Sequence, residues 1–275
     1  MISVVVLTKD EAANIGRCLE SVSWCDDVLV VDSGSTDGTQ ELAAKAGARV
    51  VQRAWDNFAN QRNYALDHGA LRHRWILHLD ADEVVTPELR EEITAIARSD
   101  AGLPGYRVAS RLMMNDSWLR HSGMYPTYQV RFGTREGLRF RMVGHGQRET
   151  LAPEQLGTLR GDLVHYNFSK GLADWLARHE RYARDEAQTA LREGGKRRWS
   201  ELFTAPDKVQ RRRAMKDLSQ RLPLRPMARF IYVYFLRRGF LDGTAGLQYA
   251  RLMARYQSMI DTNMAELRSR ERKGS

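Results

Sequence analysis

The chain has 275 residues, 43% of them hydrophobic, which is enough to bury one full α/β domain with a smaller appendage and excludes wholesale disorder. Its two cysteines, Cys18 and Cys25, are too few for a disulfide framework and lack zinc-site spacing, which favours a reducing cytoplasm. The formal net charge is +9, yet residues 192–238 alone hold fourteen Lys and Arg against four Asp and Glu, a net of +10, so the remainder sums to −1.

Apolar runs predict four buried strands in the first part of the chain, at residues 4–7, 27–31, 48–52 and 75–79. The first run is too short for a signal peptide, and we expect no membrane-spanning helix because no run of about 18 apolar residues exists. Helical periodicity follows each strand, beginning near Asp10 and then at residues 39–46, 57–68 and 87–98. Strands that alternate with helices are typical of an α/β domain with a Rossmann-like, mostly parallel sheet.

The second part of the chain changes character. Short β-like runs occupy residues 105–166, helical periodicity covers 174–191, and the chain is helical again from Lys208 onward. We therefore predict one domain over residues 1–207, with halves of about 1–100 and 101–207, followed by a basic amphipathic helical extension over residues 208–275.

Polar residues follow three of the predicted strands at their carboxyl ends. They are Thr8 to Glu11, Asp32 to Gly38, and Asp80 to Glu83. Ligands of parallel α/β sheets bind at this edge, so the three clusters predict one site. The loop after Asp32 has neither the Gly-Lys-Ser/Thr of a phosphate-binding loop nor Gly-x-Gly-x-x-Gly, which argues against a dinucleotide dehydrogenase.

Asp80 and Asp82 flank a single alanine directly after the fourth strand. Carboxylates at a strand end can hold Mg²⁺ or Mn²⁺, which prefer oxygen ligands and leave positions for phosphate oxygens. A cation there would neutralise charge on a departing nucleoside diphosphate. The alternative is a solvated acidic turn. Asp32 can similarly accept hydrogen bonds from a base or a ribose hydroxyl, or only close an Asx-turn.

Four segments together resemble the inverting family 2 glycosyltransferases. They are VVVLTKDEAANIGRCLESV, VLVVDSGSTDGTQELA, QRNYAL and LHLDADE, in this order within about the first 90 residues. The later segments MYPTYQVRF, GHGQRE and GFLDGTAGL resemble a subgroup that builds lipopolysaccharide core and other bacterial surface glycans.

The resemblance implies a GT-A fold, a nucleotide-sugar donor, which we expect to be a UDP-sugar, and a glycan or lipid-linked acceptor. Thr8, Glu11, Asp32 and Arg62 would then contact the nucleotide. Asp80 would lie near the ribose and diphosphate, and Asp82 would bind the metal with Asp80 beside it.

Inverting transfer needs one general base for the acceptor hydroxyl. Many relatives place an acidic residue directly after a histidine, but here His145 is followed by glycine. Glu149 is the preferred candidate and His145 the second, while the alternative makes Glu149 a surface carboxylate paired with Arg148. Arg131 could clamp a phosphate in bidentate geometry, or be an exposed edge-strand cation. His165 could lie on the acceptor side of the site or belong to the core, and we favour the core.

The basic segment needs its own explanation. Residues 208–238 combine cations such as Arg211, Arg212, Arg213 and Lys216 with the apolar block Phe230 to Leu236. This pattern favours an interfacial position on an anionic membrane, hence a cytoplasmic protein held peripherally at the inner face. The alternative is a core helix with a solvated basic end. We expect no nucleic-acid partner, because no recognised binding motif accompanies the charge.

Two further functions compete with glycosyl transfer. A nucleotidyltransferase that makes sugar nucleotides would normally carry a glycine-rich loop with a basic residue after the first strand, and residues 8–16 lack one. A binding module without turnover would not need its metal carboxylates, yet Asp80 and Asp82 are both present.

Overall fold

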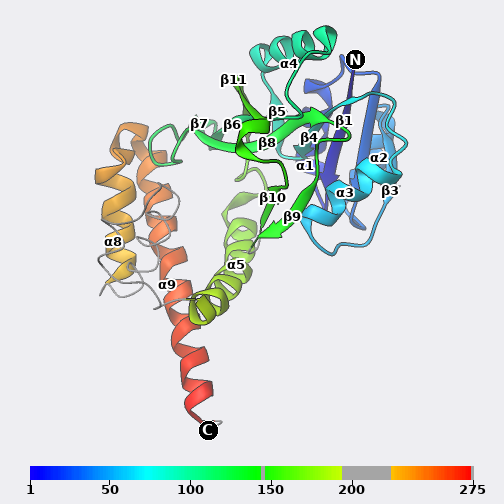
Figure 1. Cartoon of the computed structure of the whole chain (residues 1–275). Coiled ribbons are helices and arrows are strands. Elements are labelled where there is room, and N and C mark those ends of the chain that lie inside the picture. The colour runs from blue at the N-terminus through cyan, green and yellow to red at the C-terminus, as the bar shows by residue number, and fades with distance from the viewer. Residues whose placement is uncertain (144–145, 194–223, 274–275) are drawn as a thin grey trace. The chain divides into compact units, whose positions relative to one another are not determined.

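The computed structural model describes residues 1–143, 146–193 and 224–273, which form two compact units (Figure 1). The first unit comprises Met1–Arg120 and Met124–Lys170, and the second comprises His121–Gly123 and Gly171–Ser275. The predicted boundary between residues 207 and 208 lies outside the described residues. The predicted membrane-facing cations Arg211, Arg212, Arg213 and Lys216 also lie outside them.

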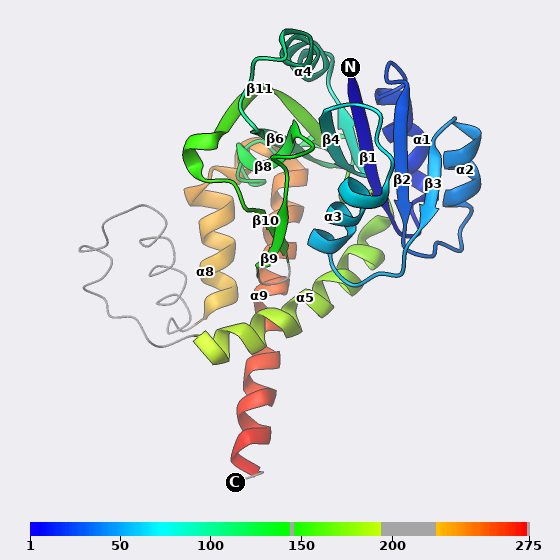
Figure 2. The same cartoon turned by 45° about the vertical axis from the view of Figure 1, so that its right-hand side comes forward.

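A nine-stranded sheet forms the centre of the first unit (Figure 2). Its strands are β1 (Ile2–Thr8), β2 (Asp27–Asp32), β3 (Arg49–Gln52), β4 (Trp75–Asp80), β5 (Glu83–Val85), β6 (Gly105–Met114), β7 (Ser117–Trp118), β8 (Thr127–Thr134) and β11 (Leu156–His165). Their order is β3-β2-β1-β4-β8-β6-β11-β5, with β7 beside β6. The first four strands are parallel as predicted, whereas β8 and β5 run antiparallel to their neighbours, so the sheet is mixed.

Helices cover both faces of this sheet. They are α1 (Ala12–Ser21), α2 (Thr39–Lys45), α3 (Phe58–His68) and α4 (Pro87–Ser99). Two of them begin at an N-cap side chain. Asn57 accepts a hydrogen bond from the Asn60 amide at the start of α3, and Thr86 accepts one from the Leu89 amide at the start of α4. These features confirm the predicted α/β class with helices flanking the sheet.

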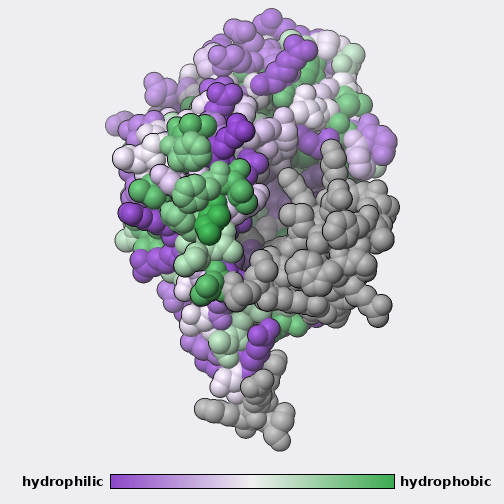
Figure 3. All heavy atoms as spheres, turned by 90° about the vertical axis from the view of Figure 1, so that its left-hand side faces the viewer, coloured by the Kyte–Doolittle hydropathy of each residue, from purple (hydrophilic) through white to green (hydrophobic). Residues whose placement is uncertain are grey.

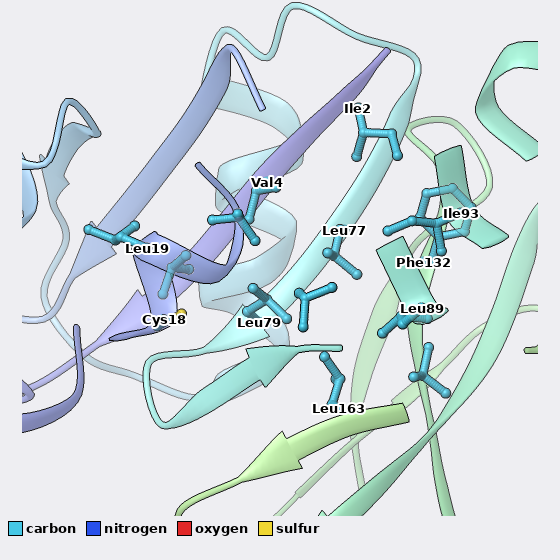
Figure 4. Packing of buried hydrophobic residues seen from close by; sticks show 14 of the residues in the cluster. Ile2, Val4, Cys18, Leu19, Leu77, Leu79, Leu89, Ile93, Phe132 and Leu163 are labelled. Carbon is cyan, nitrogen blue, oxygen red and sulfur yellow. The ribbon is translucent and has the colours of Figure 1, made fainter. Parts of the chain in front are cut away.

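Packing on both faces of the sheet explains the continuous apolar run within β1. Val4 packs with residues of α1 and α4 on one face of the sheet (Figure 4), and Val6 belongs to the same cluster. Val5 and Leu7 pack with residues of α3 on the other face. Strand side chains alternate between faces, so a strand covered on both sides is apolar throughout. Each such buried side chain contributes about 1.5–3 kcal/mol, which holds the strand ends rigidly in register.

The second unit is helical. It contains α5 (Gly171–Glu193), α8 (Arg225–Ile231), a π-helical turn (Tyr232–Leu236), a 3₁₀ turn (Gly239–Asp242) and α9 (Gly243–Lys273). α5 packs on α9 through Ala183, Ala187, Ile260 and Met264. No helix within the described ranges has both the length and the apolar character needed to cross a membrane.

One buried carboxylate ties this unit together. The Asp242 side chain, only 3% exposed, accepts hydrogen bonds from Ser122 Oγ at 2.7 Å, from the Ser122 amide at 2.8 Å, and from the amide of His121. His121 Nδ1 lies 2.8 Å from the same carboxylate. Burial raises the pKa of Asp242, but the hydrogen bonds from Ser122 and His121 prevail and lower it.

We expect Asp242→Asn to lower the free energy of unfolding by roughly 2–3 kcal/mol. The asparagine side chain has only one acceptor oxygen, and its NH₂ group would face the donors of Ser122 and His121 that now bind the carboxylate. Chemical denaturation followed by circular dichroism measures the loss. The matched control is Asp174→Asn, which alters a partly exposed ion pair with Arg178 and should cost about 0.5 kcal/mol or less.

The depressed pKa adds a pH test of the same prediction. The stability that Asp242 contributes should be fully present above pH 3.8, the usual value for an aspartate, and should be lost as the pH falls through the lower folded value. A variant as stable as the parent at neutral pH would contradict this role.

Candidate functional site

The carboxyl ends of β1, β2 and β4 lie side by side in the first unit. The parallel register pairs Thr8 with Asp32 and Leu7 with Asp80. The three polar clusters predicted at one sheet edge are therefore brought together by the strand pairing itself. The candidate site is built on this edge.

The Asp32 carboxylate is buried and organises the loop after β2. It accepts hydrogen bonds from Thr8 Oγ1 at 2.8 Å, from the amides of Gly34 and Ser35 at 2.9 and 2.8 Å, and from Gln40 Nε2 at 2.7 Å. Burial raises the pKa of Asp32, but the hydrogen bonds from Ser35, Thr8 and Gly34 outweigh burial and lower it. Because the chain's own donors use both oxygens, the nucleotide contacts of Thr8 and Asp32 stay predictions.

Glu11 lies at the same edge, just before α1. Its carboxylate accepts hydrogen bonds from Lys170 Nζ at 2.6 Å and from Asn14 Nδ2 at 2.7 Å. Burial raises the pKa of Glu11, and Lys170 and Asn14 offset only part of the rise. Sequence reasoning missed Lys170, because it lies 159 residues away from Glu11 and a single lysine before a glycine forms no pattern.

The centre of the site is a cluster of two arginines and two carboxylates. Arg62 Nη2 donates to one oxygen of Asp80 at 2.6 Å, and Arg131 Nη2 donates to the other at 2.5 Å. The same Arg131 nitrogen donates to Glu83 at 2.7 Å, while Glu83 accepts from the Asp80 amide at 2.9 Å. Arg62 and Arg131 are 1% and 2% exposed, whereas the Asp80 side chain is 30% exposed. Asp80 is therefore the member of the cluster that solvent reaches.

Burial and pairing separate the charges within this cluster. Burial raises the pKa of Asp80, but Arg131 and Arg62 hold it well below the usual range. Burial raises the pKa of Glu83, with Arg131 opposing and Asp80 adding to the rise. Burial and repulsion from Arg131 lower the pKa of Arg62 to about 10. Asp80 is thus firmly ionised, held between two guanidinium groups.

The cluster also has unused hydrogen-bonding capacity. Within the described part of the chain, six buried nitrogen atoms here lack a partner: Nε and Nη1 of both Arg62 and Arg131, and both ring nitrogens of His78. Burial, with Arg62 and Arg131 nearby, pushes the pKa of His78 well below its usual value, so this ring is neutral. An unpaired buried donor costs about 1–3 kcal/mol, so these atoms call for a functional explanation.

Asp82 lies beside the cluster and contacts His165. His165 Nε2 is 3.2 Å from Asp82 Oδ2, and the Tyr166 amide donates to the Asp82 carbonyl at 2.8 Å. Burial lowers the pKa of His165, but the carboxylates of Asp82, Glu83 and Asp80 together outweigh burial and raise it to about 9. His165 is 28% exposed, so its interpretation as a core residue is wrong. Its position at the end of β11, like that of Asp80 at the end of β4, was the available indication.

Few carboxylate oxygens of the site are available as ligands for a cation. In the described ranges, no group of three or more His, Cys, Asp and Glu side chains is arranged to hold a metal ion. Both Asp80 oxygens accept from arginines, and Asp82 is 15% exposed. These residues fit a Mg²⁺ or Mn²⁺ that takes one or two carboxylates and fills its other positions with phosphate and water oxygens. The metal roles of Asp80 and Asp82 stay predictions.

Glu149 lies on a separate hairpin formed by β9 (Phe140–Val143) and β10 (Gly146–Glu149). It pairs with Phe140, and because neighbouring residues on a strand point to opposite faces, it shares a face with Phe140 and not with Arg148. The Phe140 ring lies 5.2 Å from the His78 ring and 5.9 Å from the Arg62 guanidinium. The hairpin therefore contacts the arginine cluster through Phe140, and Glu149 is the cross-strand partner of that residue. His145 lies outside the described residues.

Comparison with known proteins adds a family likeness. The model of glycosyl transferase family 2 matches residues 3–150, more than half of the chain. An uncharacterized glycosyltransferase of Rickettsia felis is 41% identical over 99 residues, 36% of this chain and 34% of that protein, so this chain spans about a third of that relative. The lipopolysaccharide core biosynthesis glycosyltransferase LpsC of Rhizobium meliloti is 27% identical over 221 residues, 74% of this chain and 77% of LpsC.

A solved structure is similar at lower identity. It is the glucosyl-3-phosphoglycerate synthase of Mycobacterium tuberculosis in complex with Mn²⁺, uridine diphosphate and glucosyl-3-phosphoglycerate. It is 19% identical with a TM-score of 0.47, over 70% of this chain and 79% of that one.

Proposed function

This chain belongs to glycosyl transferase family 2, and we propose that it transfers a sugar, with inversion, from a nucleotide-sugar donor to a glycan or lipid-linked acceptor. One observation carries the proposal: Asp80 is held ionised between two buried arginines at the carboxyl edge of the sheet, with Asp82 beside it. This is the edge at which α/β sheets bind nucleotides.

The donor is proposed to lie along the three strand ends. Thr8, Glu11, Asp32 and Arg62 would surround the nucleotide of a UDP-sugar, and Asp80 would lie near its ribose and diphosphate. The unpartnered nitrogens of Arg62 and Arg131 support this placement, because diphosphate oxygens are acceptors that match guanidinium donors. A modest rearrangement of the cluster would be needed to bring them together, since both arginines are buried.

Activity is proposed to depend on Mg²⁺ or Mn²⁺, held by Asp82 with Asp80 close by. When bound, such a cation supplies Lewis-acid stabilisation of the charge that develops on the leaving nucleoside diphosphate. Asp82 fits this role because its carboxylate is partly exposed, while Asp80 is already oriented by Arg62 and Arg131.

Inversion places the acceptor hydroxyl on the face of the sugar opposite the leaving group, where one base removes its proton. Glu149 is the proposed base. Its support is its position on the face of the hairpin that carries Phe140, which contacts the Arg62 side of the cluster. His145 is the second candidate.

We expect Glu149→Gln to retain donor binding and to lower transfer by about 10²-fold or more, the usual weight of a positioned base. Steady-state transfer and calorimetric titration of the donor separate the two effects. Arg148→Gln is the matched control, since its side chain lies on the other face of β10. Normal transfer by Glu149→Gln together with an inactive His145→Ala would move the role to His145.

The acceptor is proposed to belong to bacterial cell-surface polysaccharide or lipopolysaccharide synthesis. Support comes from the segments MYPTYQVRF and GFLDGTAGL and from the likeness to LpsC over most of the chain. A lipid-linked acceptor would be met at the inner face of the cell membrane, so we propose a peripheral position there.

A screen of nucleotide sugars tests the function as a whole. The protein is incubated with UDP-, GDP-, CMP- and ADP-sugars, with and without Mn²⁺, and thermal stabilisation and nucleotide release are measured. We expect one UDP-sugar to stabilise the protein and to be hydrolysed slowly only with the metal. Failure of every nucleotide sugar to bind would overturn the proposal.

A further inference from the structure

The helical unit presents a compact apolar surface to solvent. Six large apolar residues between the start of α8 and the 3₁₀ turn are 47–72% exposed: Leu224, Met227, Phe235, Leu236, Phe240 and Leu241. We call this set the apolar surface. Figure 3 shows apolar residues gathered on the face of the molecule that carries α8. Single exposed apolar residues are ordinary, but a contiguous group marks a binding surface.

The local fold decides which residues form this surface. Within the apolar block Phe230 to Leu236, Val233 is 1% exposed and the rings of Phe230 and Tyr234 stack at 5.4 Å. Phe235 and Leu236 point outward instead, and residues beyond the block join them. Only part of the apolar block is therefore available to a membrane or to another partner.

Tertiary contacts fix the backbone that carries the apolar surface. A Cβ on Gly239 would lie 2.6 Å from the Val233 carbonyl oxygen, so the 3₁₀ turn packs directly on the π-helical turn. The buried Asp242 carboxylate then fastens the end of this turn to Ser122. The exposed side chains at positions 235, 236, 240 and 241 are thus presented by a fixed backbone.

The charged residues in the segment that carries the apolar surface are all positive. Residues 224–241 contain four arginines and no Asp or Glu. Arg225 pairs with Asp261, whereas Arg229 lies over the Tyr232 ring and Arg238 is exposed. Among the described residues, Arg229 and Arg238 form no ion pair. Aromatic and aliphatic side chains beside such arginines match the interface of an anionic bilayer, where lipid tails meet phosphate headgroups.

We infer that the apolar surface lies in the interfacial region of an anionic membrane, with the arginines against lipid phosphates. A second copy of the chain is a poorer occupant, because a two-fold interface would set arginines against arginines. The inference rests on the proposed function in one respect, that the membrane presents the acceptor. Binding itself needs no turnover, so the two can fail separately.

Sedimentation of the 275-residue chain with vesicles tests the inference. We expect binding to phosphatidylcholine–phosphatidylglycerol vesicles and little binding to phosphatidylcholine alone. Phe235→Ser with Leu236→Ser should weaken partitioning about tenfold or more, by removing the apolar contribution. Arg229→Gln with Arg238→Gln should weaken binding about tenfold, and only to the anionic vesicles.

The matched control is Leu42→Ser with Trp55→Ser, which removes two apolar side chains of the first unit that are 44% and 49% exposed. Its partitioning should equal that of the parent. Thermal melts check that each variant folds, and donor hydrolysis in solution should stay within about twofold of the parent, since no donor-site residue changes.

Three results would overturn the inference. The parent could bind neither vesicle, the Phe235 and Leu236 variant could bind like the parent, or that variant could turn a dimer into a monomer with vesicle binding unchanged. The last result would assign the surface to a second copy. Absent hydrolysis in every protein, with vesicle binding as expected, would instead refute the proposed function and leave the surface standing.

Discussion

Asp82→Ala is expected to lower metal-dependent turnover on the order of a thousandfold, because Lewis-acid stabilisation of a leaving diphosphate contributes several kcal/mol. Donor binding should weaken as well, since the cation links the carboxylate to the phosphates. The measurement is nucleotide-sugar turnover against Mn²⁺ concentration, with calorimetric titration of Mn²⁺ in the presence of UDP. Full activity of the variant at limiting Mn²⁺ would refute the metal assignment.

Two controls sharpen this experiment. Asp67→Ala removes a 48% exposed carboxylate of the same unit, paired with Arg139, and should leave turnover unchanged. His165→Gln removes the neighbour that lies 3.2 Å from Asp82 while leaving the carboxylate in place. Metal dependence should persist in His165→Gln. Its loss there would mean that the carboxylate acts through the histidine and not through a cation.

Arg131→Met is expected to lower the free energy of unfolding by about 3–5 kcal/mol, because it leaves buried carboxylates without their partner. A single nitrogen of Arg131 now donates to both Asp80 and Glu83. Glu83 is 1% exposed, so it cannot turn to solvent. Donor affinity should fall too, since Asp80 loses one of the two groups that orient it. Denaturant unfolding and donor titration measure these effects.

A double variant isolates the cause. Arg131→Met with Glu83→Gln removes one buried carboxylate along with the arginine and should recover part of the lost stability, which gives a coupling free energy on the order of 1–3 kcal/mol. Arg74→Met is the matched control, because its ion pair with Asp100 is 53% and 58% exposed and should contribute less than about 1 kcal/mol. Additive effects of the Arg131 and Glu83 substitutions would contradict the shared ion pair.

Much of the donor half could be predicted from local patterns. The runs that form β1, β2 and β4 are apolar because both faces of the sheet are covered, and each run ends in the polar residue that starts the site. These local patterns therefore place Thr8, Asp32 and Asp80 at one edge of the sheet. They do not predict the partners of these residues, because the partners come from distant segments.

The missed residues show what a local pattern lacks. Glu83 joins Arg131 across 48 residues, and His165 joins Asp82 across 83. The pairing of carboxylates with basic side chains depends on β8 lying beside β4 and on β5 lying beside β11 in the sheet. A short local stretch of sequence does not reveal this strand order. The metal, nucleotide and base roles of the site residues remain predictions for the experiments above.

The sequence by itself determined the α/β class, the strand ends that build the site and the family, because continuous apolar runs and the four ordered segments are properties of neighbouring residues. Only the tertiary structure decided how the charges pair and which apolar residues reach solvent. The block Phe230 to Leu236 is uniformly apolar, yet Val233 is buried and Leu236 is 72% exposed. Gly239 packs on the Val233 carbonyl, and the Asp242 carboxylate binds Ser122. Such contacts between separate segments cannot be predicted from local sequence patterns.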